Sequence, residues 1–402
     1  MESLLYSGAH WIASSEELVR ACGRWQNSRL LAVDTEFVRE RTFRPILGLI
    51  QIADEEGVSL IDPQAVGDLA PLAELLVAPG IDKIFHSCSE DLEVFRDRLD
   101  LVATPIFDSQ LAAAFAGYGW SLGYSRLIAT LFDIVLPKTE TRSDWLRRPL
   151  SSAQLEYAAL DVAHLPEAYR RLEQELRLRD RLEIFREDCQ RITDEAARPE
   201  DREAPYRKIA ASRLWSRREL GLLYELVRWR EDEARRRDLP RNFVLPEAAV
   251  PVIVQLKPTS PAQFAKIEVL KGRDTSRLAP KLIELVTRAL QAPPEDLPEP
   301  FPRPLDVQPF KKTLQGLRAA LEQVAAAENL PAELLANRRS LESLIRRYLQ
   351  QDEPLLPRKL RGWREKMLGP ALLAVLEADL KDLRLTRPAS AAASASEEAE
   401  AE

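Results

Sequence analysis

The chain has 402 residues, of which 64 are acidic and 57 are Lys or Arg, giving a formal net charge of −7. This length is enough for two or three domains with cores of their own, and 45% hydrophobic with 30% charged residues is typical of a globular protein. No apolar run reaches the length of a transmembrane helix, and the first residues lack the basic start and apolar core of a signal peptide. The 3 cysteines are far apart, which argues against a disulfide framework or a thiolate zinc site. We therefore expect a cytoplasmic protein without a membrane partner.

Residues 1–200 predict an α/β domain with a mixed sheet. Strands are expected at 30–38, 46–53, 57–61 and 83–86. Helices are expected at 14–28, 68–77, from residue 87 onward, 108–117, 121–132 and 151–174, with a loop at 133–150. The turn-like segment 54–57 joins the second and third strands as a hairpin. Strands followed by alternating strand and helix favour this class of fold.

After residue 205 the pattern is helical throughout. The expected segments are a helical block at 207–290, a proline-rich linker at 291–307, a second helical block at 308–385 and a disordered acidic tail at 386–402. The two blocks resemble each other, because a long helix ends at Leu239-Pro240 in the first and at Leu330-Pro331 in the second. This repetition indicates two related helical modules.

Basic residues are concentrated in two stretches although the net charge is negative. Residues 202–241 contain twelve basic and seven acidic side chains, and residues 338–367 contain nine and four. Such stretches can bind phosphate, but they can equally be solvated faces of helices.

Two acidic side chains interrupt the buried-type strand at 30–38. Asp34 and Glu36 are two positions apart, so their side chains point to the same side of the strand, about 6–7 Å apart. Carboxylates held this close beside apolar cover repel each other unless a cation lies between them. The Asp-x-Glu pattern also recurs elsewhere in this acidic chain, so its place on a buried strand is what makes it informative. It predicts a site for divalent metal.

Asp91 follows the strand at 83–86 and falls in the first turn of the next helix, where Ser87 and Glu90 fit a capping box. An acid at this position also simply complements the helix dipole. However, residues at the carboxyl ends of neighbouring strands converge on one crevice, which would bring Asp91 toward Asp34.

A third candidate lies on the helix that begins near Ser151, which Gln154 can help to cap. Tyr157 and Asp161 are four positions apart on this helix and therefore lie side by side. A tyrosine and an aspartate on a solvated helix edge are the alternative reading of this pair.

In combination these residues resemble the exonuclease superfamily with four invariant acids, in the variant that carries tyrosine. Its sibling variant carries histidine at the position of Glu156. The surrounding sequence is similar to the bacterial ribonuclease D family in four segments: Val33–Arg39, Leu47–Gln51, His86–Phe95 and Glu140–Leu146. The resemblance covers about residues 10–385, because that family also carries helicase-and-RNase-D C-terminal (HRDC) helical modules.

The resemblance implies an α/β exonuclease domain of the ribonuclease H-like type, followed by two all-α modules. It implies that Asp34, Glu36, Asp91 and Asp161 bind two divalent metal ions, Mg²⁺ or Mn²⁺, and that Tyr157 orients or helps to deprotonate the attacking water. The expected activity is 3′→5′ trimming of structured RNA, with tRNA precursors as substrates and nucleoside 5′-monophosphates as products.

Two further residues and two other functions stay open. Phe37 and Arg142 can contact substrate, although a structural role fits both equally well. A DNA-directed exonuclease of the same superfamily would carry the same acids. A non-catalytic RNA-binding adaptor would be expected to have lost at least one of them.

Overall fold

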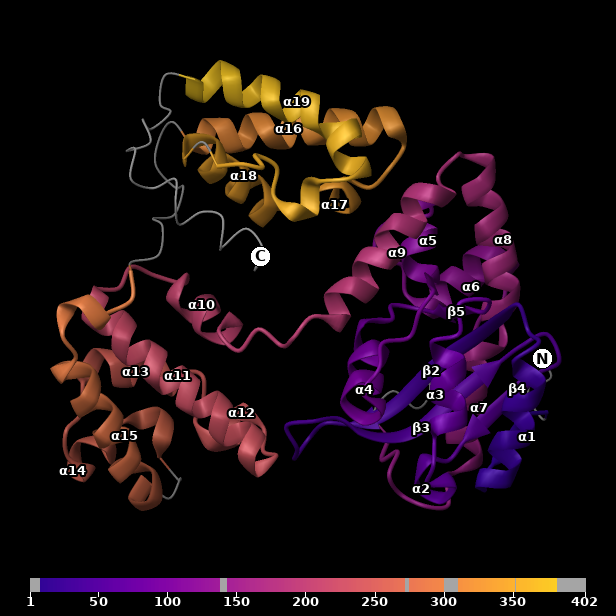
Figure 1. Cartoon of the computed structure of the whole chain (residues 1–402), viewed down its shortest axis with the longest axis horizontal. Coiled ribbons are helices and arrows are strands. Elements are labelled where there is room, and N and C mark those ends of the chain that lie inside the picture. The colour runs from indigo at the N-terminus through magenta and orange to yellow at the C-terminus, as the bar shows by residue number, and fades with distance from the viewer. Residues whose placement is uncertain (1–7, 138–142, 272–274, 300–309, 351, 382–402) are drawn as a thin grey trace.

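The computed structural model describes residues 8–137, 143–271, 275–299, 310–350 and 352–381. An α/β domain is followed by two helical modules (Figure 1), which confirms the predicted fold class. None of the described helices is both long and apolar enough to cross a bilayer. The predicted tail at 386–402 and residues 300–307 of the predicted linker lie outside the described residues.

The α/β domain is built on a six-stranded mixed sheet in the order β1-β4-β3-β2-β5-β6. The strands are β1 (His10–Ile12), β2 (Leu30–Val38), β3 (Ile46–Ala53), β4 (Val58–Ile61), β5 (Asp82–Phe85) and β6 (Ile106–Asp108). Strand β2 lies inside the sheet, antiparallel to β3 and parallel to β5. The predictions missed β1 and β6 because a strand of three residues is too short to show an alternating pattern.

Nine helices accompany the sheet in the described part of the α/β domain. They are α1 (Ser15–Trp25), α2 (Pro63–Val66), α3 (Ala70–Leu76), α4 (Ser89–Leu99), α5 (Ser109–Phe115), α6 (Tyr124–Phe132), α7 (Ser152–Ala163), α8 (Leu165–Leu178) and α9 (Leu182–Ala197). Helix α7 packs on β2, β3 and β4, and α8 packs on β2 and β5. The single helix expected at 151–174 is in fact two helices that meet at His164, because Pro166 lacks the N–H that a continuous helix would need.

The turn between β5 and α4 differs from its prediction. Ser87 has a φ of 65°, and the residue that caps α4 is Cys88, whose side chain makes no capping hydrogen bond, so the predicted capping box of Ser87 and Glu90 is wrong. The carboxylate of Asp108 instead accepts from the backbone N–H groups of Ser87 (3.3 Å) and Cys88 (2.8 Å). A side chain from the end of β6 thus fixes the turn that places Asp91.

The first helical module has a hydrophobic core of its own. Its elements are α10 (Ala204–Ala210), α11 (Arg217–Arg237), α12 (Arg241–Val244), α13 (Ala249–Leu256), α14 (Pro261–Phe264) and α15 (Thr275–Gln291), with 3₁₀ turns η1 (Glu268–Leu270) and η2 (Pro294–Asp296). Buried side chains such as Leu223, Leu226, Val250 and Leu282 pack between α11, α13 and α15.

The second module repeats the start of the first. Its elements are α16 (Phe310–Glu328), α17 (Ala332–Leu335), α18 (Arg338–Gln350), η3 (Arg358–Leu360) and α19 (Trp363–Leu380). Helices α11 and α16 are each followed by a residue in the left-handed region, Asp238 (φ 49°) and Asn329 (φ 48°). Pro240 and Pro331 then begin the short helices α12 and α17.

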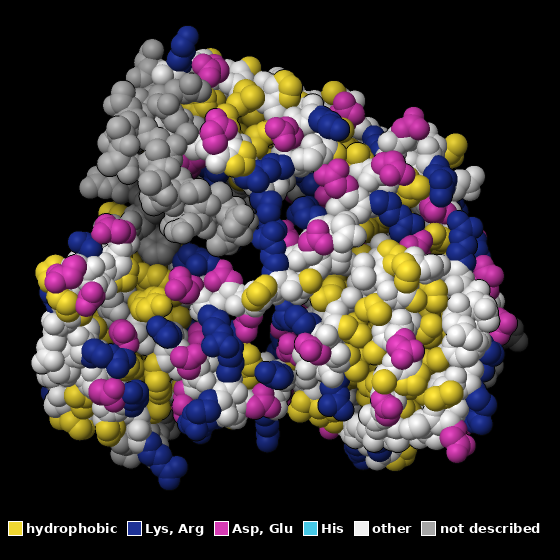
Figure 2. Space-filling model, viewed as in Figure 1, with side chains coloured by type: hydrophobic (Ala, Val, Ile, Leu, Met, Phe, Trp, Pro, Cys, Tyr) yellow, Lys and Arg dark blue, Asp and Glu magenta, His cyan; other side chains and the backbone are white. Residues whose placement is uncertain are grey.

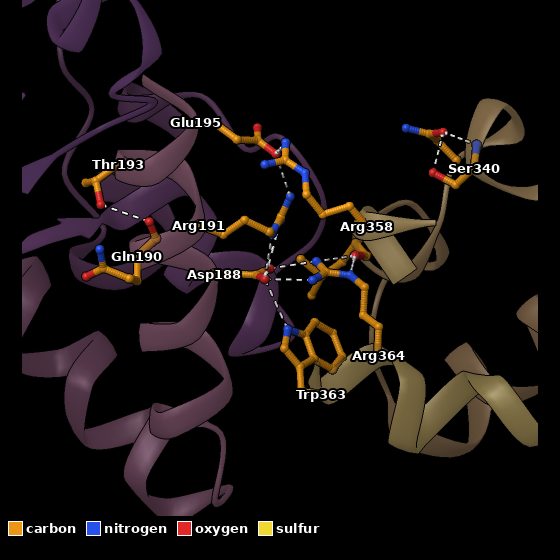
Figure 3. A network of polar contacts seen from close by, with 11 residues as sticks. Asp188, Gln190, Arg191, Thr193, Glu195, Ser340, Arg358, Trp363 and Arg364 are labelled. Carbon is orange, nitrogen blue, oxygen red and sulfur yellow. Dashed lines mark hydrogen bonds and ion pairs between the residues drawn. The ribbon is translucent and has the colours of Figure 1, made fainter. Parts of the chain in front are cut away.

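The second module shares one continuous core with the α/β domain. A buried polar network joins the two parts (Figure 3), in which the Arg364 guanidinium donates to both carboxylate oxygens of Asp188 at 2.6 Å. The Trp363 indole N–H donates to the same carboxylate at 3.1 Å. Asp188 is 1% exposed and Arg364 5%, so the pair is sealed within the interface.

The first module meets the α/β domain at the tip of the β2–β3 hairpin (Figure 1). The backbone N–H groups of Phe43 and Arg44 both donate to the Asp238 carboxylate at 3.1 Å. The Phe43 ring lies 4.8 Å from the Arg235 guanidinium and 4.7 Å from that of Arg241. Unlike the Asp188 network, this contact joins two separate hydrophobic cores.

Candidate active site

Three of the predicted acids meet at one point. The carboxylates of Asp34, Glu36 and Asp161 each offer an oxygen atom, and these atoms lie within 4.8 Å of one another. Strand β2 supplies the first two from one of its sides, and α7 packs across β2 to bring Asp161 beside them. The predicted capping box of Ser151 and Gln154 is present at the start of α7.

Asp91 does not belong to this set of three but lies next to it. The Thr35 hydroxyl, between Asp34 and Glu36 in sequence, donates to Asp91 Oδ1 at 2.6 Å. The Asp91 side chain is buried, and it lies close enough for the charge of Asp34 to act on it. Four carboxylates are therefore gathered at the junction of β2, α4 and α7.

The pKa values of these acids show that the site disfavours their ionised forms. Burial, followed by the charge of Asp161, raises the pKa of Asp34 to about 8. Burial, followed by the charges of Asp34, Asp161 and Asp91, raises the pKa of Glu36 to about 9. Burial raises the pKa of Asp161 to about 7, and that of Asp91 also lies well above its usual range. A bound cation would favour the ionised forms and remove much of this cost.

The donor set fits a hard divalent cation. Carboxylate oxygens are the ligands that Mg²⁺ and Mn²⁺ prefer, whereas zinc sites usually include His or Cys. Within the described residues, the group suited to a metal contains only carboxylates. The three cysteines are buried and unpaired, and none of them belongs to this group.

Tyr157 lies beside the acids on α7, one turn before Asp161. Burial, followed by the charges of Asp161 and Glu36, raises the pKa of its hydroxyl. A cleft of about 630 Å³ opens next to Tyr157 and Asp161. Leu136, Leu160 and Arg126 also line this cleft, so it offers both an apolar wall and a cation.

The two residues predicted to contact substrate have different outcomes. Phe37 follows Glu36 on β2, is half-buried against the core, and has the Arg39 guanidinium 5.9 Å from its ring centre. Arg142 lies outside the described residues.

Several supporting residues were not anticipated. The Gln51 side-chain amide on β3 lies 3.4 Å from Asp34 Oδ2, Thr35 holds Asp91, and Asp108 fixes the turn before α4. Neither Thr35 nor Gln51 had a signal of its own, because each occupies an ordinary strand position. Asp108 could have been recognised as a helix cap, since its carboxylate also accepts from the Leu111 N–H at 3.0 Å.

Comparison with known proteins identifies the family to which this chain belongs. A 3′-5′ exonuclease domain matches residues 9–177, an HRDC domain matches 219–286, and the C-terminal HRDC domain of ribonuclease D matches 309–372. The chain is 39% identical to ribonuclease D of Pseudomonas paraeruginosa over 369 residues, which cover 91% of this chain and 97% of that protein. The chain belongs to the ribonuclease D family.

Other members of the ribonuclease D family agree with this assignment. The protein from Escherichia coli K12 is 33% identical over 370 residues, covering 91% of this chain and 98% of its own. The crystal structure of E. coli RNase D matches with a TM-score of 0.85 at 32% identity, over 92% of this chain and 99% of that one. The catalytic core of RRP6 from Trypanosoma brucei, at 22% identity and a TM-score of 0.59, shares the fold. As a ribonuclease D-family protein, the chain is a 3′→5′ exoribonuclease.

Proposed function

We propose that this exoribonuclease trims structured RNAs, tRNA precursors among them, from the 3′ end and releases nucleoside 5′-monophosphates in the cytoplasm. The E. coli relative is described as an exoribonuclease involved in structured RNA processing, which supports this substrate class. Three buried, unpaired thiols fit a reducing compartment. The proposed metal-dependent hydrolysis rests on one observation: carboxylate oxygens of Asp34, Glu36 and Asp161 lie within 4.8 Å of one another.

The metal ions belong to this proposal. Asp34, Glu36, Asp91 and Asp161 would hold two ions, Mg²⁺ or Mn²⁺. Bound ions of this kind polarise a scissile phosphate and make water a nucleophile at neutral pH. Their number fits the arrangement of one tight set of three acids with a fourth acid beside it.

The protein's own groups position the reactants. The Tyr157 hydroxyl would orient the attacking water, and the neighbouring cleft would receive the terminal nucleotide with its base against Leu136 and Leu160. Attack of water on the phosphorus, with departure of the 3′ oxygen of the preceding nucleotide, gives a 5′-monophosphate. Arg126 lines the same cleft and can pair with phosphate.

Basic side chains support an RNA path across the molecule. In the space-filling view many Lys and Arg side chains surround the opening between the α/β domain and the two modules (Figure 2). Several arginines are already engaged in ion pairs; Arg235, for example, pairs with Glu200 and Glu231. The free energy of RNA binding therefore comes from only part of the basic residues seen in sequence.

A product assay tests the proposal. A tRNA precursor labelled at its last internucleotide phosphate should release labelled nucleoside 5′-monophosphate with Mg²⁺ or Mn²⁺, and chelation should stop the release. An Asp34→Asn variant is the matched control and should release none. Release of 3′-monophosphates, internal cleavage, or hydrolysis that persists after chelation would contradict the proposal. Faster trimming of a DNA of matched sequence would favour the DNA-directed alternative.

A further inference from the structure

We propose that three residues outside the acidic cluster, Trp145, Arg148 and Asp62, form a strut that is anchored on the strand beside β2 and positions Tyr157 for hydrolysis. The strut belongs to the segment between α6 and α7 and to the end of β4. This inference rests on the proposed role of Tyr157 and adds positioning residues to it.

Arg148 is the centre of the strut. Its Nε–H and one Nη2–H donate to the two carboxylate oxygens of Asp62, both at 2.7 Å. Its other N–H groups donate to the backbone oxygens of Gly48 (2.7 Å), Trp145 (2.9 Å) and Arg147 (3.0 Å). The guanidinium thus uses its whole donor capacity, which a lysine could not reproduce.

Asp62 gives the strut a rigid base. It directly follows β4, is 5% exposed, and accepts from the Gln64 N–H at 3.0 Å as the cap of α2. Burial alone would raise its pKa, but the hydrogen bonds and charge of Arg148 hold the pKa of Asp62 below its usual value. The ion pair is consequently formed throughout the neutral pH range.

One end of the strut contacts β3, the strand that pairs with β2. The pairing of β2 with β3 shifts between Glu36, opposite Leu49, and Phe37, opposite Leu47, so Gly48 is the extra residue of a β-bulge. A Cβ at Gly48 would come 2.7 Å from the Trp145 backbone oxygen. The close approach of the strut therefore requires glycine, and it fixes the bulge next to Glu36.

The other end of the strut contacts the catalytic helix. The Trp145 side chain is 3% exposed, and its ring lies 6.1 Å from the Tyr157 ring at an interplanar angle of 36°. The Gln154 side chain on α7 donates to the Asp144 backbone oxygen at 3.3 Å, which ties the same segment to the helix. The orientation of Tyr157 is thus coupled to Arg148 through one packed side chain.

A purely structural role of the strut and a positioning role predict different kinetic effects when the strut is lost. An anchor for the loop would stabilise the domain, and its loss would affect all variants of the active site alike. A strut that acts through Tyr157 would lose its kinetic effect once the Tyr157 hydroxyl is gone. This difference can be measured.

The experiment is a double-mutant cycle of Arg148→Lys with Tyr157→Phe, assayed on a short single-stranded RNA well below the melting temperature. We expect Arg148→Lys to lower kcat by about 10- to 100-fold, the range for a misplaced catalytic group, with KM changed by no more than about twofold. In the Tyr157→Phe background the same substitution should change kcat by less than about twofold. Arg147→Lys, at the exposed neighbouring arginine, is the control and should leave kcat unchanged.

Asp62→Asn provides a second test should Arg148→Lys fold poorly, because asparagine keeps the cap of α2 while it removes the charge that Arg148 faces. It should give a smaller loss of kcat, which also disappears with Tyr157→Phe. Equal losses in both backgrounds would overturn the strut while leaving the proposed role of Tyr157 intact. An unchanged rate for Tyr157→Phe alone would overturn that role and the strut with it.

Discussion

Asp34 and Glu36 make folding without a ligand less favourable. Both are buried next to further acids, and their pKa values rise to about 8 and about 9. A carboxyl group with a raised pKa binds protons in the folded state at a pH where the unfolded chain has released them. The buried acids therefore lower the free energy of unfolding of the metal-free domain, and this loss of stability grows as the pH rises.

This gives a pH-dependent prediction. Without metal, the melting temperature should fall from pH 6 to pH 8, because the unfolded acids, with pKa values near 4, are already ionised there while the folded ones are not. Asp34→Asn should show a shallower fall, and saturating Mg²⁺ should remove most of it in the wild type. Thermal melts followed by circular dichroism measure this. In chelator, the change in melting temperature from pH 6 to pH 8 is compared between the wild type and Asp34→Asn. A change that is more positive for the wild type than for the variant would contradict this explanation.

At the scale of elements, the β2–β3 hairpin connects the chemistry to the rest of the molecule. Its base carries Asp34 and Glu36, its bulge at Gly48 receives the strut, and its tip at Phe43 contacts the first module. One pair of strands thus joins the acids, the loop before α7 and a helical module.

The bulge yields a prediction about stability. Gly48→Ala should destabilise the protein by about 1–3 kcal/mol, the usual cost of overpacking, because its Cβ would meet the Trp145 backbone, and kcat should fall as well. Gly23→Ala is the matched control. Gly23 lies within α1 with nothing in reach of an added Cβ, so alanine there should stabilise by roughly 0.5–1 kcal/mol. Urea denaturation measures both values, and a Gly48→Ala protein as stable as the wild type would show that Trp145 is not packed against the bulge.

The sequence predicted the elements that have a strong local pattern. Strands β2, β3 and β4, the capping box of α7 and the paired modules all follow from hydrophobic periodicity or capping chemistry, and the i,i+4 spacing of Tyr157 and Asp161 places them together. The strut could not be predicted from the sequence, because Asp62 and Arg148 are 86 residues apart and no local pattern specifies their pairing. The capping box at Ser87 failed for the same reason: Asp108, a distant side chain, satisfies the N–H groups of that turn.

At the scale of the whole molecule, the two helical modules are attached in different ways. The second module shares a hydrophobic core with the α/β domain and is joined to it by the buried Asp188–Arg364 pair. The first module has a separate core and contacts the α/β domain through the hairpin tip and through ion pairs such as Glu200 with Arg235. Truncation after residue 205 would therefore remove part of the core on which the catalytic domain is built.

Two substitutions within the interface of the second module test how tightly that module is held. Asp188→Ala should cost about 3–5 kcal/mol of unfolding free energy, because it leaves the Arg364 charge buried without its partner. Glu195→Ala, which breaks the nearby pair with Arg358 at about one-third exposure, should cost no more than about 1 kcal/mol. Chemical denaturation gives both values. Equal costs for the two substitutions would indicate that the second module is held no more tightly than by a surface contact.

We propose that the four acids hold the metal ions with which the protein hydrolyses RNA. Calorimetric titration of Mn²⁺ into the wild type and Asp34→Asn, with RNA affinity and hydrolysis measured on the same samples, tests it most directly. We predict two bound ions for the wild type and weaker or fewer ions for Asp34→Asn. Hydrolysis by the variant should fall at least about 10³-fold, equivalent to about 4 kcal/mol of barrier, with RNA affinity retained. Near-normal hydrolysis by Asp34→Asn, or its full complement of bound ions, would contradict the account.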